Sequence, residues 1–180
     1  GTGTTSFTGL LDTNTASGIS LNGSAFTLSG GATTTTGGTF TLANSAASSL
    51  SGTYTLDGAF SQTGAGGVTL NAAITTTADA VSFNAPVTLG GNSSISTGAG
   101  VGDITFTDTL DGGFNLSLTA GTGSIFFNGA VGGTTRLGDL TIVSAANVSG
   151  SSVRAASITQ SAGTGTTSFT GLLDTNTASG

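Results

Sequence analysis

Apolar and small polar residues alternate along most of the chain, with a period of two. The alternation is clearest in the short stretches TFTL, VTLN, VSFN, ITFT and TIVS. Alternation of β-branched and aromatic residues with polar ones predicts strands that have one buried face. Gly, Asn and Asp interrupt these stretches every few positions, as turns require, and no stretch has the period of a helix. The pattern therefore predicts an all-β fold.

A longer pattern, eleven positions in length, groups these stretches into regular units. Its consensus is G-x-G-x-[V/I/T]-x-[F/L]-x-x-x-[V/I/L], with copies beginning at Gly64, Thr77, Gly100, Gly121 and Gly163. The interval from Gly121 to Gly163 is twice that from Gly100 to Gly121, and only the stretch around Thr77 is out of phase. Units of this length are too small to fold alone and indicate stacked coils. We therefore expect a right-handed parallel β-solenoid with coils of about 20 residues.

Stacked coils place equivalent side chains above one another, which predicts apolar columns inside the solenoid. The central column is expected to hold one residue from each pattern. Its predicted members are Phe7, Phe83, Phe106, Phe127, Val148 and Phe169. A neighbouring column is predicted from Val81, Ile104 and Ile125, and a third, after the next bend, from Val87, Leu110, Val131 and Leu173. A weaker column is predicted from Leu118, Leu140 and Ile158.

The chain ends with the sequence with which it begins, since 1–18 and 163–180 both read GTGTTSFTGLLDTNTASG. The identity defines a repeat, so that 1–162 is one unit of about eight coils and 163–180 begins the next. We expect a window on a longer tandem array, whose units stack end to end without a seam and place Phe7 and Phe169 equivalently. A tail duplicated by engineering is the alternative explanation.

Composition excludes several classes of function. The chain contains no His or Cys, and its charged residues are two arginines and eight aspartates. Without His and Cys, the usual zinc, copper, haem and iron–sulfur ligand sets cannot form, and neither can Ser-His-Asp or Cys-His nucleophiles. A net charge of −6 opposes nucleic-acid binding. No apolar run is long enough for a transmembrane helix, which opposes membrane insertion.

Two stretches, ASITQSAGTGTTSF at 156–169 and GSIFFNGAV at 123–131, resemble the repeats of giant bacterial surface proteins. These are the filamentous-haemagglutinin-type and related β-strand-repeat exoproteins. The similarity covers essentially the whole unit and lies in composition, coil length and the x-F-N-G-x-V pattern. It implies an exported β-solenoid that serves as a fibre or adhesin, and it includes no diagnostic catalytic motif.

Three aspartates form the candidate metal site. Asp103, Asp108 and Asp111 fall within GDITFTDTLDGG, and carboxylates on successive bends could bind calcium, which prefers several oxygen ligands. The preceding GAGVGD at 98–103 is similar to a calcium-binding nonapeptide. The alternative is that these aspartates cap turns and keep the surface soluble. No other metal or cofactor is expected.

The remaining polar motifs are weaker. Arg136 and Arg154 lie nearly one coil apart, so they could stack on one outer face and contact a sugar, or one of them could pair with Asp139. The threonine runs at 32–39 and 74–79 suggest ice binding, but their threonines drift relative to the coils. Four Asn-x-Ser sequons are about as many as the composition predicts. They begin at Asn22, Asn92, Asn115 and Asn147.

The features together predict a structural protein rather than an enzyme. We expect a repeat module of a long extracellular or cell-surface filament, whose partner is itself through end-to-end stacking of repeats. Lateral bundling of fibres is a further possible contact. The alternative is the stalk or glycan-binding region of a large bacterial adhesin, in which outer Thr, Asn and Asp side chains contact surface glycans. A paired-carboxylate glycosidase is disfavoured because a closed solenoid offers no cleft between two carboxyls.

Overall fold

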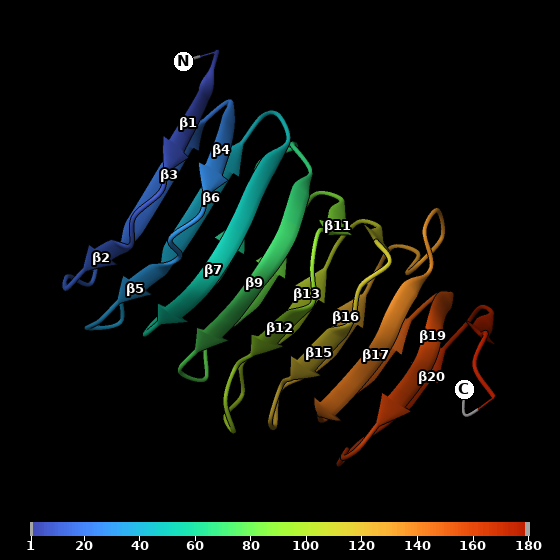
Figure 1. The fold of residues 1–180 in the computed structure, drawn as a ribbon. Coiled ribbons are helices and arrows are strands. Elements are labelled where there is room, and N and C mark those ends of the chain that lie inside the picture. The colour runs from blue at the N-terminus through green and yellow to red at the C-terminus, as the bar shows by residue number, and fades with distance from the viewer. Residues whose placement is uncertain (1, 179–180) are drawn as a thin grey trace.

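The structure is a computed structural model that describes residues 2–178. These residues form 21 β-strands and contain no helix, and hence none that could cross a membrane. The strands stack in parallel as a β-solenoid of about 8 turns, with coils about 21 residues apart (Figure 1). The predicted all-β solenoid is therefore confirmed. In Figure 1 the front strands run downward while the chain advances to the right and returns behind, which is the right-handed sense.

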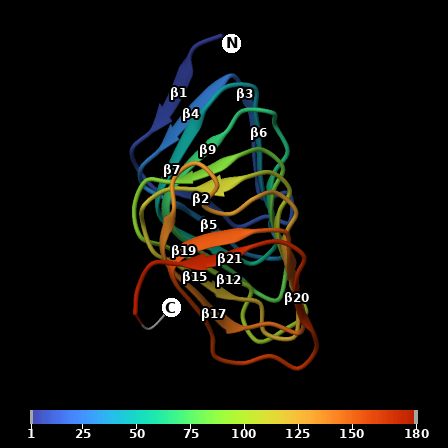
Figure 2. The ribbon, with the colours of Figure 1, turned by 90° about the vertical axis from the view of Figure 1, so that its right-hand side faces the viewer.

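Two parallel sheets form the walls of the solenoid and lie on opposite sides of each coil (Figure 2). The larger sheet has 13 strands. They are β1 (Thr4–Phe7), β2 (Leu11–Thr13), β4 (Ala25–Leu28), β5 (Ala32–Thr34), β7 (Ser48–Leu56), β9 (Val68–Thr76), β11 (Val87–Leu89), β12 (Ser93–Ser96), β14 (Leu110–Asp111), β15 (Leu116–Thr119), β17 (Leu137–Ser144), β19 (Val153–Gln160) and β21 (Leu173–Thr175).

The smaller sheet has 8 strands, one from each coil. They are β3 (Ile19–Gly23), β6 (Phe40–Asn44), β8 (Phe60–Gln62), β10 (Val81–Phe83), β13 (Ile104–Phe106), β16 (Ile125–Phe127), β18 (Val148–Gly150) and β20 (Thr167–Phe169). Each coil therefore contributes one short strand to this sheet and a longer or two-part strand to the larger sheet. The apolar positions of both sheets face inward, so the core lies between them.

The inner face of the smaller sheet carries two columns of side chains. The first column is Ile19, Phe40, Phe60, Val81, Ile104, Ile125, Val148 and Thr167. The second column is Leu21, Leu42, Gln62, Phe83, Phe106, Phe127, Gly150 and Phe169. In the second column the rings of Phe83, Phe106 and Phe127 are stacked, with successive centroids 5.5 and 5.7 Å apart. These ring contacts add to the stabilisation that comes from the buried area.

One member of the predicted aromatic column lies in the other column. Val148 pairs with Ile125, and Gly150 lies between Phe127 and Phe169. The placement of Val148 was wrong because the coil from Ile125 to Val148 is two residues longer than the preceding one, from Ile104 to Ile125. Two extra residues shift the register by one inward position, since every second side chain of a strand points inward.

Phe7 and Phe169 do not occupy equivalent places, although the residues around them are identical. Phe7 belongs to β1 and pairs with Leu28 in the larger sheet. Phe169 belongs to β20 and pairs with Gly150 in the smaller sheet. The predicted equivalence was wrong because β1 takes its register from the coil that follows it, whereas β20 takes its register from the coil that precedes it.

The column predicted after the next bend is present in the larger sheet. Val87, Leu110 and Val131 pair in succession, and Val153 lies in the coil between Val131 and Leu173. Val87, Leu110 and Val131 stand at the last position of the eleven-residue pattern, so aligning its copies predicted this column correctly although the two spacings differ by two residues.

The weaker column is only partly as predicted. Leu140 pairs with Ile158, as expected, but its partner in the preceding coil is Leu116 rather than Leu118. The shift has the same origin as that of Val148, since this coil is two residues longer than the predicted spacing.

Candidate functional site

The outer face of the larger sheet carries three columns of small or polar side chains. Each strand contributes alternate residues to this face, for example Asn71, Ala73 and Thr75 from β9. The first column is Ser51, Asn71, Asn92, Asn115, Asp139 and Ser157. The second is Thr53, Ala73, Ser94, Ser117, Thr141 and Thr159. The third is Thr33, Thr55, Thr75, Ser96 and Thr119.

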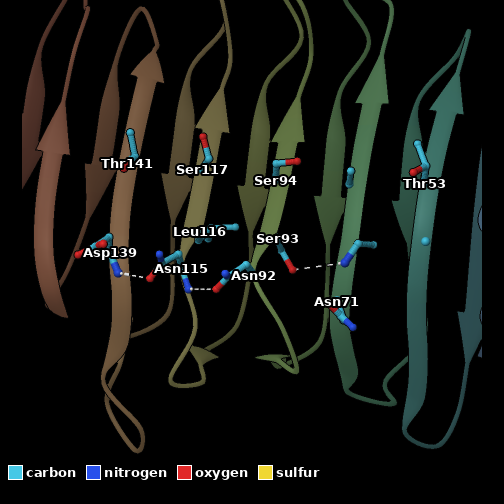
Figure 3. A pocket seen from close by; sticks show the side chains of 13 residues that line it. Thr53, Asn71, Asn92, Ser93, Ser94, Asn115, Leu116, Ser117, Asp139 and Thr141 are labelled. Carbon is cyan, nitrogen blue, oxygen red and sulfur yellow. Dashed lines mark hydrogen bonds between the residues drawn. The ribbon is translucent and has the colours of Figure 1, made fainter.

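Side chains of the first column bind the coil that follows them. The Oδ1 atom of Asn92 accepts a hydrogen bond from the backbone N–H of Asn115 at 3.0 Å, and Asn115 Oδ1 accepts one from Asp139 N–H at 2.8 Å (Figure 3). The hydroxyl of Ser157 donates to Asp139 Oδ1 at 2.6 Å. These side chains thus extend the backbone ladder, and the amide Nδ2 groups of the two asparagines stay available at the exposed surface.

A shallow groove of about 620 Å³ crosses these columns where β7, β9, β12, β15 and β17 lie side by side (Figure 3). The lining residues come from five successive coils. They are Gly52, Thr53, Asn71, Ala72, Ala73, Asn92, Ser93, Ser94, Asn115, Leu116, Ser117, Asp139 and Thr141. Small residues occupy the middle of the groove, so the space above them stays open.

The groove offers hydrogen-bonding groups and almost no charge. Asp139 is the one ionisable residue among the thirteen that line it. The other polar groups are asparagine amides and serine or threonine hydroxyls, which both donate and accept. Such a surface suits an uncharged, hydroxyl-rich ligand better than an ionic one. It contains one carboxylate, whereas a paired-carboxylate glycosidase needs two on either side of the scissile bond.

The three aspartates of the candidate calcium site each accept hydrogen bonds from different backbone N–H groups. Asp103 Oδ1 accepts from Ser124 N–H at 2.7 Å, and Asp108 Oδ1 accepts from the adjacent Thr109 N–H at 2.7 Å. Asp111 Oδ1 accepts from two backbone N–H groups of the following coil, those of residues 134 and 135. Residues 2–178 contain no group of three or more such ligands close enough to share a metal ion. The carboxylate of Asp108 thus accepts within its own turn, whereas those of Asp103 and Asp111 accept from the following coil.

The two arginines lie together and bind one aspartate of the repeated stretch. Asp174 Oδ2 is 2.5 Å from Arg136 Nη2 and 3.2 Å from Arg154 Nε. Arg136 also donates to the backbone oxygen of Asp174 at 2.6 Å. The hydrogen bond from Arg136, with a weaker one from Arg154, lowers the pKa of Asp174. The predicted pairing of Asp139 with an arginine was wrong, since Asp139 binds Ser157.

Two features of the outer face escaped prediction from the sequence. The threonines do not drift once the strands are paired, because Thr33, Thr55 and Thr75 fall in register. Unequal loops hide this alignment in the linear sequence. Two of the four sequons, at Asn92 and Asn115, belong to the first column. The signal for the first column was present in the sequence but was missed. In four successive coils, an Asn or Asp stands either one or three positions before an Ile or Leu whose side chain points inward.

Comparisons of this chain with protein-family models, with curated proteins and with solved structures find no match. The resemblance to filamentous-haemagglutinin-type exoproteins is therefore supported at the level of the β-solenoid fold alone.

Proposed function

We propose that this chain is a structural repeat module of a long extracellular filament or surface fibre. The observation that carries the proposal is the repeated stretch itself. Residues 163–178, which restart the sequence, pair with the last coil of the unit through β20 and β21. A second unit that begins with this stretch can extend the same ladder. The extracellular location in the proposal comes from the sequence resemblance.

The mechanical properties of such a module follow from its ladder and core. Each coil is joined to the next by parallel backbone hydrogen bonds that run along the fibre axis. A single bond of this kind contributes about 0.5–1.5 kcal/mol net, so many must break together before the stack opens. Inside, columns of apolar side chains hold neighbouring coils in register, because a slip by one position would turn every inward side chain outward.

Chains with one, two and three repeats test this proposal. Each coil should lengthen the particle by about 4.8 Å, the spacing of paired strands. Small-angle scattering should therefore show a constant cross-section and a length that increases linearly with repeat number. Particles that become wider rather than longer, or repeats that tumble independently, would contradict a continuous filament.

The groove supports a second candidate, the glycan-binding region of an adhesin. Its uncharged amide and hydroxyl groups, repeated from coil to coil, match the hydroxyls of a saccharide chain. A glycan array with the full chain would identify ligands. Ser117→Val and Thr141→Val should then abolish binding, whereas Thr105→Val on the smaller sheet should not. Equal binding by all three variants would exclude the groove.

A further inference from the structure

One stretch of sequence adopts two registers in this structure. In the first copy, Thr4–Phe7 pairs with β4 of the larger sheet, and Leu11–Thr13 pairs with β5 of the same sheet. In the second copy, Thr167–Phe169 pairs with β18 of the smaller sheet, and Leu173–Thr175 pairs with β19 of the larger sheet. We call the sequence common to both ends, 1–18 and 163–180, the shared stretch.

The same side chains point inward in both registers. Phe7 pairs with the buried Leu28, and Phe169, its counterpart, lies in the inner column beyond Phe127 and Gly150. The next strand behaves in the same way. Its Leu11 pairs with the buried Ala32, and the counterpart of Leu11, which is Leu173, pairs with the buried Val153. The apolar core can therefore continue through the shared stretch, because no side chain has to move from the inner to the outer face of its strand.

The two registers also use different edges of the stretch. In the second copy the stretch pairs with the coil that precedes it, and in the first copy it pairs with the coil that follows it. A strand within a sheet has two edges, each with its own row of hydrogen-bonding groups. One copy placed between two repeats can therefore make both sets of bonds at once.

Coil length excludes the simpler arrangement, in which each sheet continues into the same sheet of the next repeat. The shortest spacing between paired residues of the smaller sheet is that from Val148 to Thr167. If that sheet continued, Thr5, the counterpart of Thr167, would have to pair with Ile19. The spacing from Thr5 to Ile19 is five residues shorter than the spacing from Val148 to Thr167. Pairing of Thr5 with Phe26 instead gives the spacing of an ordinary coil.

The end of the repeat is shaped to receive this stretch. A side chain at Gly150 would meet the ring of Phe169, since a Cβ there would lie 3.1 Å from two ring carbons. The carboxylate of Asp174 is held by Arg136 and Arg154, which are the only basic residues of the chain. Asp12, its counterpart in the first copy, forms no ion pair within residues 2–178.

We propose that the shared stretch is an adaptor coil, which docks on the end of one repeat in the second register and starts the following repeat in the first register. The occupant of the end surface is thus residues 1–18 of the next copy of this repeat. The smaller sheet of one repeat then runs into the larger sheet of the next, and the groove faces a new direction after each junction. The inference rests on the proposed function only in joining repeats end to end.

Cysteine cross-linking tests the two registers, and the chain has no native cysteine to interfere. Residues facing each other on paired parallel strands lie within disulfide reach. In the single-repeat chain, Ser149→Cys with Ser168→Cys reports the docking register, and Ser6→Cys with Thr27→Cys reports the starting register. Both pairs should oxidise at least about tenfold faster than Ser6→Cys with Ser20→Cys, because of their higher effective concentration.

The decisive arm uses a chain of two repeats, in which Ser168 is also Ser6 of the second repeat. We expect the Ser168→Cys side chain to link to Ser149→Cys of the first repeat in one variant. In another variant it should link to Thr27→Cys of the second repeat. Linkage to Ser20→Cys of the second repeat, or loss of the link to Thr27→Cys, would overturn the adaptor.

Cryo-electron microscopy of the unsubstituted two-repeat chain makes the same comparison if a variant misfolds. The adaptor predicts that the smaller sheet of the first repeat continues into the larger sheet of the second, and continuation into the smaller sheet would overturn it. A compact two-repeat particle would instead contradict the filament itself, whatever the cross-links.

Discussion

Arg136 and Asp174 form an ion pair of 2.5 Å, although the two residues are separated by 38 positions in the sequence. Asp12, in the identical stretch at the other end of the chain, pairs in register with Thr33 instead. One local sequence therefore has two environments, and the difference comes from the coils against which it packs.

This difference provides a matched pair of substitutions. Asp174→Asn removes the charge that both arginines bind, so we expect faster amide exchange in β20 and β21. Asp12→Asn changes the same residue of the same stretch and should leave those amides unaffected. Hydrogen exchange read by mass spectrometry measures both. Equal protection of β21 in the two variants would show that backbone pairing alone seats the stretch.

Acid should weaken the solenoid through two aspartates. The pKa of Asp174 is lowered chiefly by Arg136, and that of Asp57 is lowered chiefly by the backbone N–H of Gly37. A group whose pKa is lowered on folding stabilises the fold above its unfolded pKa, about 3.9 for Asp. That contribution is lost as the pH falls through the lowered values.

Thermal unfolding followed between pH 6 and pH 2 tests this dependence. The melting temperature should fall at the acid end, and the fall should be smaller when Asp57 and Asp174 are both replaced by Asn. An identical acid profile for that double variant would assign the effect to other groups.

The stacked phenylalanines should dominate the stability of the middle coils. Phe106 is 1% exposed and lies between the rings of Phe83 and Phe127. Phe106→Ala should lower the free energy of unfolding by about 3–5 kcal/mol, because it removes the buried ring and leaves a cavity. Phe114→Ala is the control, since Phe114 is 42% exposed and should change the value by less than about 0.5 kcal/mol. Urea unfolding gives both numbers, and equal losses would contradict the stacked core.

Gln62 interrupts the same column with a satisfied polar group. Its Nε2 donates to Asn44 Oδ1 at 2.8 Å, and its Oε1 accepts from the backbone N–H groups of Asn84 and Ala85. Gln62→Leu would leave Asn44 Oδ1 and the Ala85 N–H buried without these hydrogen bonds, at about 1–3 kcal/mol for each group left unpaired. The Asn84 N–H would keep its bond to the backbone oxygen of Gln62. Urea unfolding should show the loss. The exposed Gln160→Leu should cost little, and similar losses for both glutamines would argue against the buried network.

Replacement of Tyr54 should raise the stability of the fold, whereas replacement of Gln62 should lower it. Its hydroxyl is buried without a hydrogen-bond partner among residues 2–178, and burial raises its pKa. The ring is already held edge-on by Phe40 and Phe60. Tyr54→Phe should keep these contacts and remove the unpaired hydroxyl, raising stability by about 1 kcal/mol. A lower melting temperature by calorimetry would indicate that the hydroxyl is stabilising.

The class of fold follows from the sequence because its causes are local or periodic. Alternation of apolar and polar residues gives the strands, and the recurrence of the longer pattern gives the coil. The column from Val87 through Leu110 to Val131 could be predicted for this reason, since its members share the last position of that pattern. Exclusion of His- and Cys-based chemistry needed no structure at all, because those side chains are absent.

Register and surface were decided by the tertiary structure. Loops of unequal length displaced Val148 from the predicted column and concealed the outer rows of asparagine and threonine. No local rule assigns Asp174 to the two arginines, or gives Phe7 and Phe169 different sheets. Those outcomes depend on which coil lies above or below, since in a parallel ladder each strand takes its register from its neighbours.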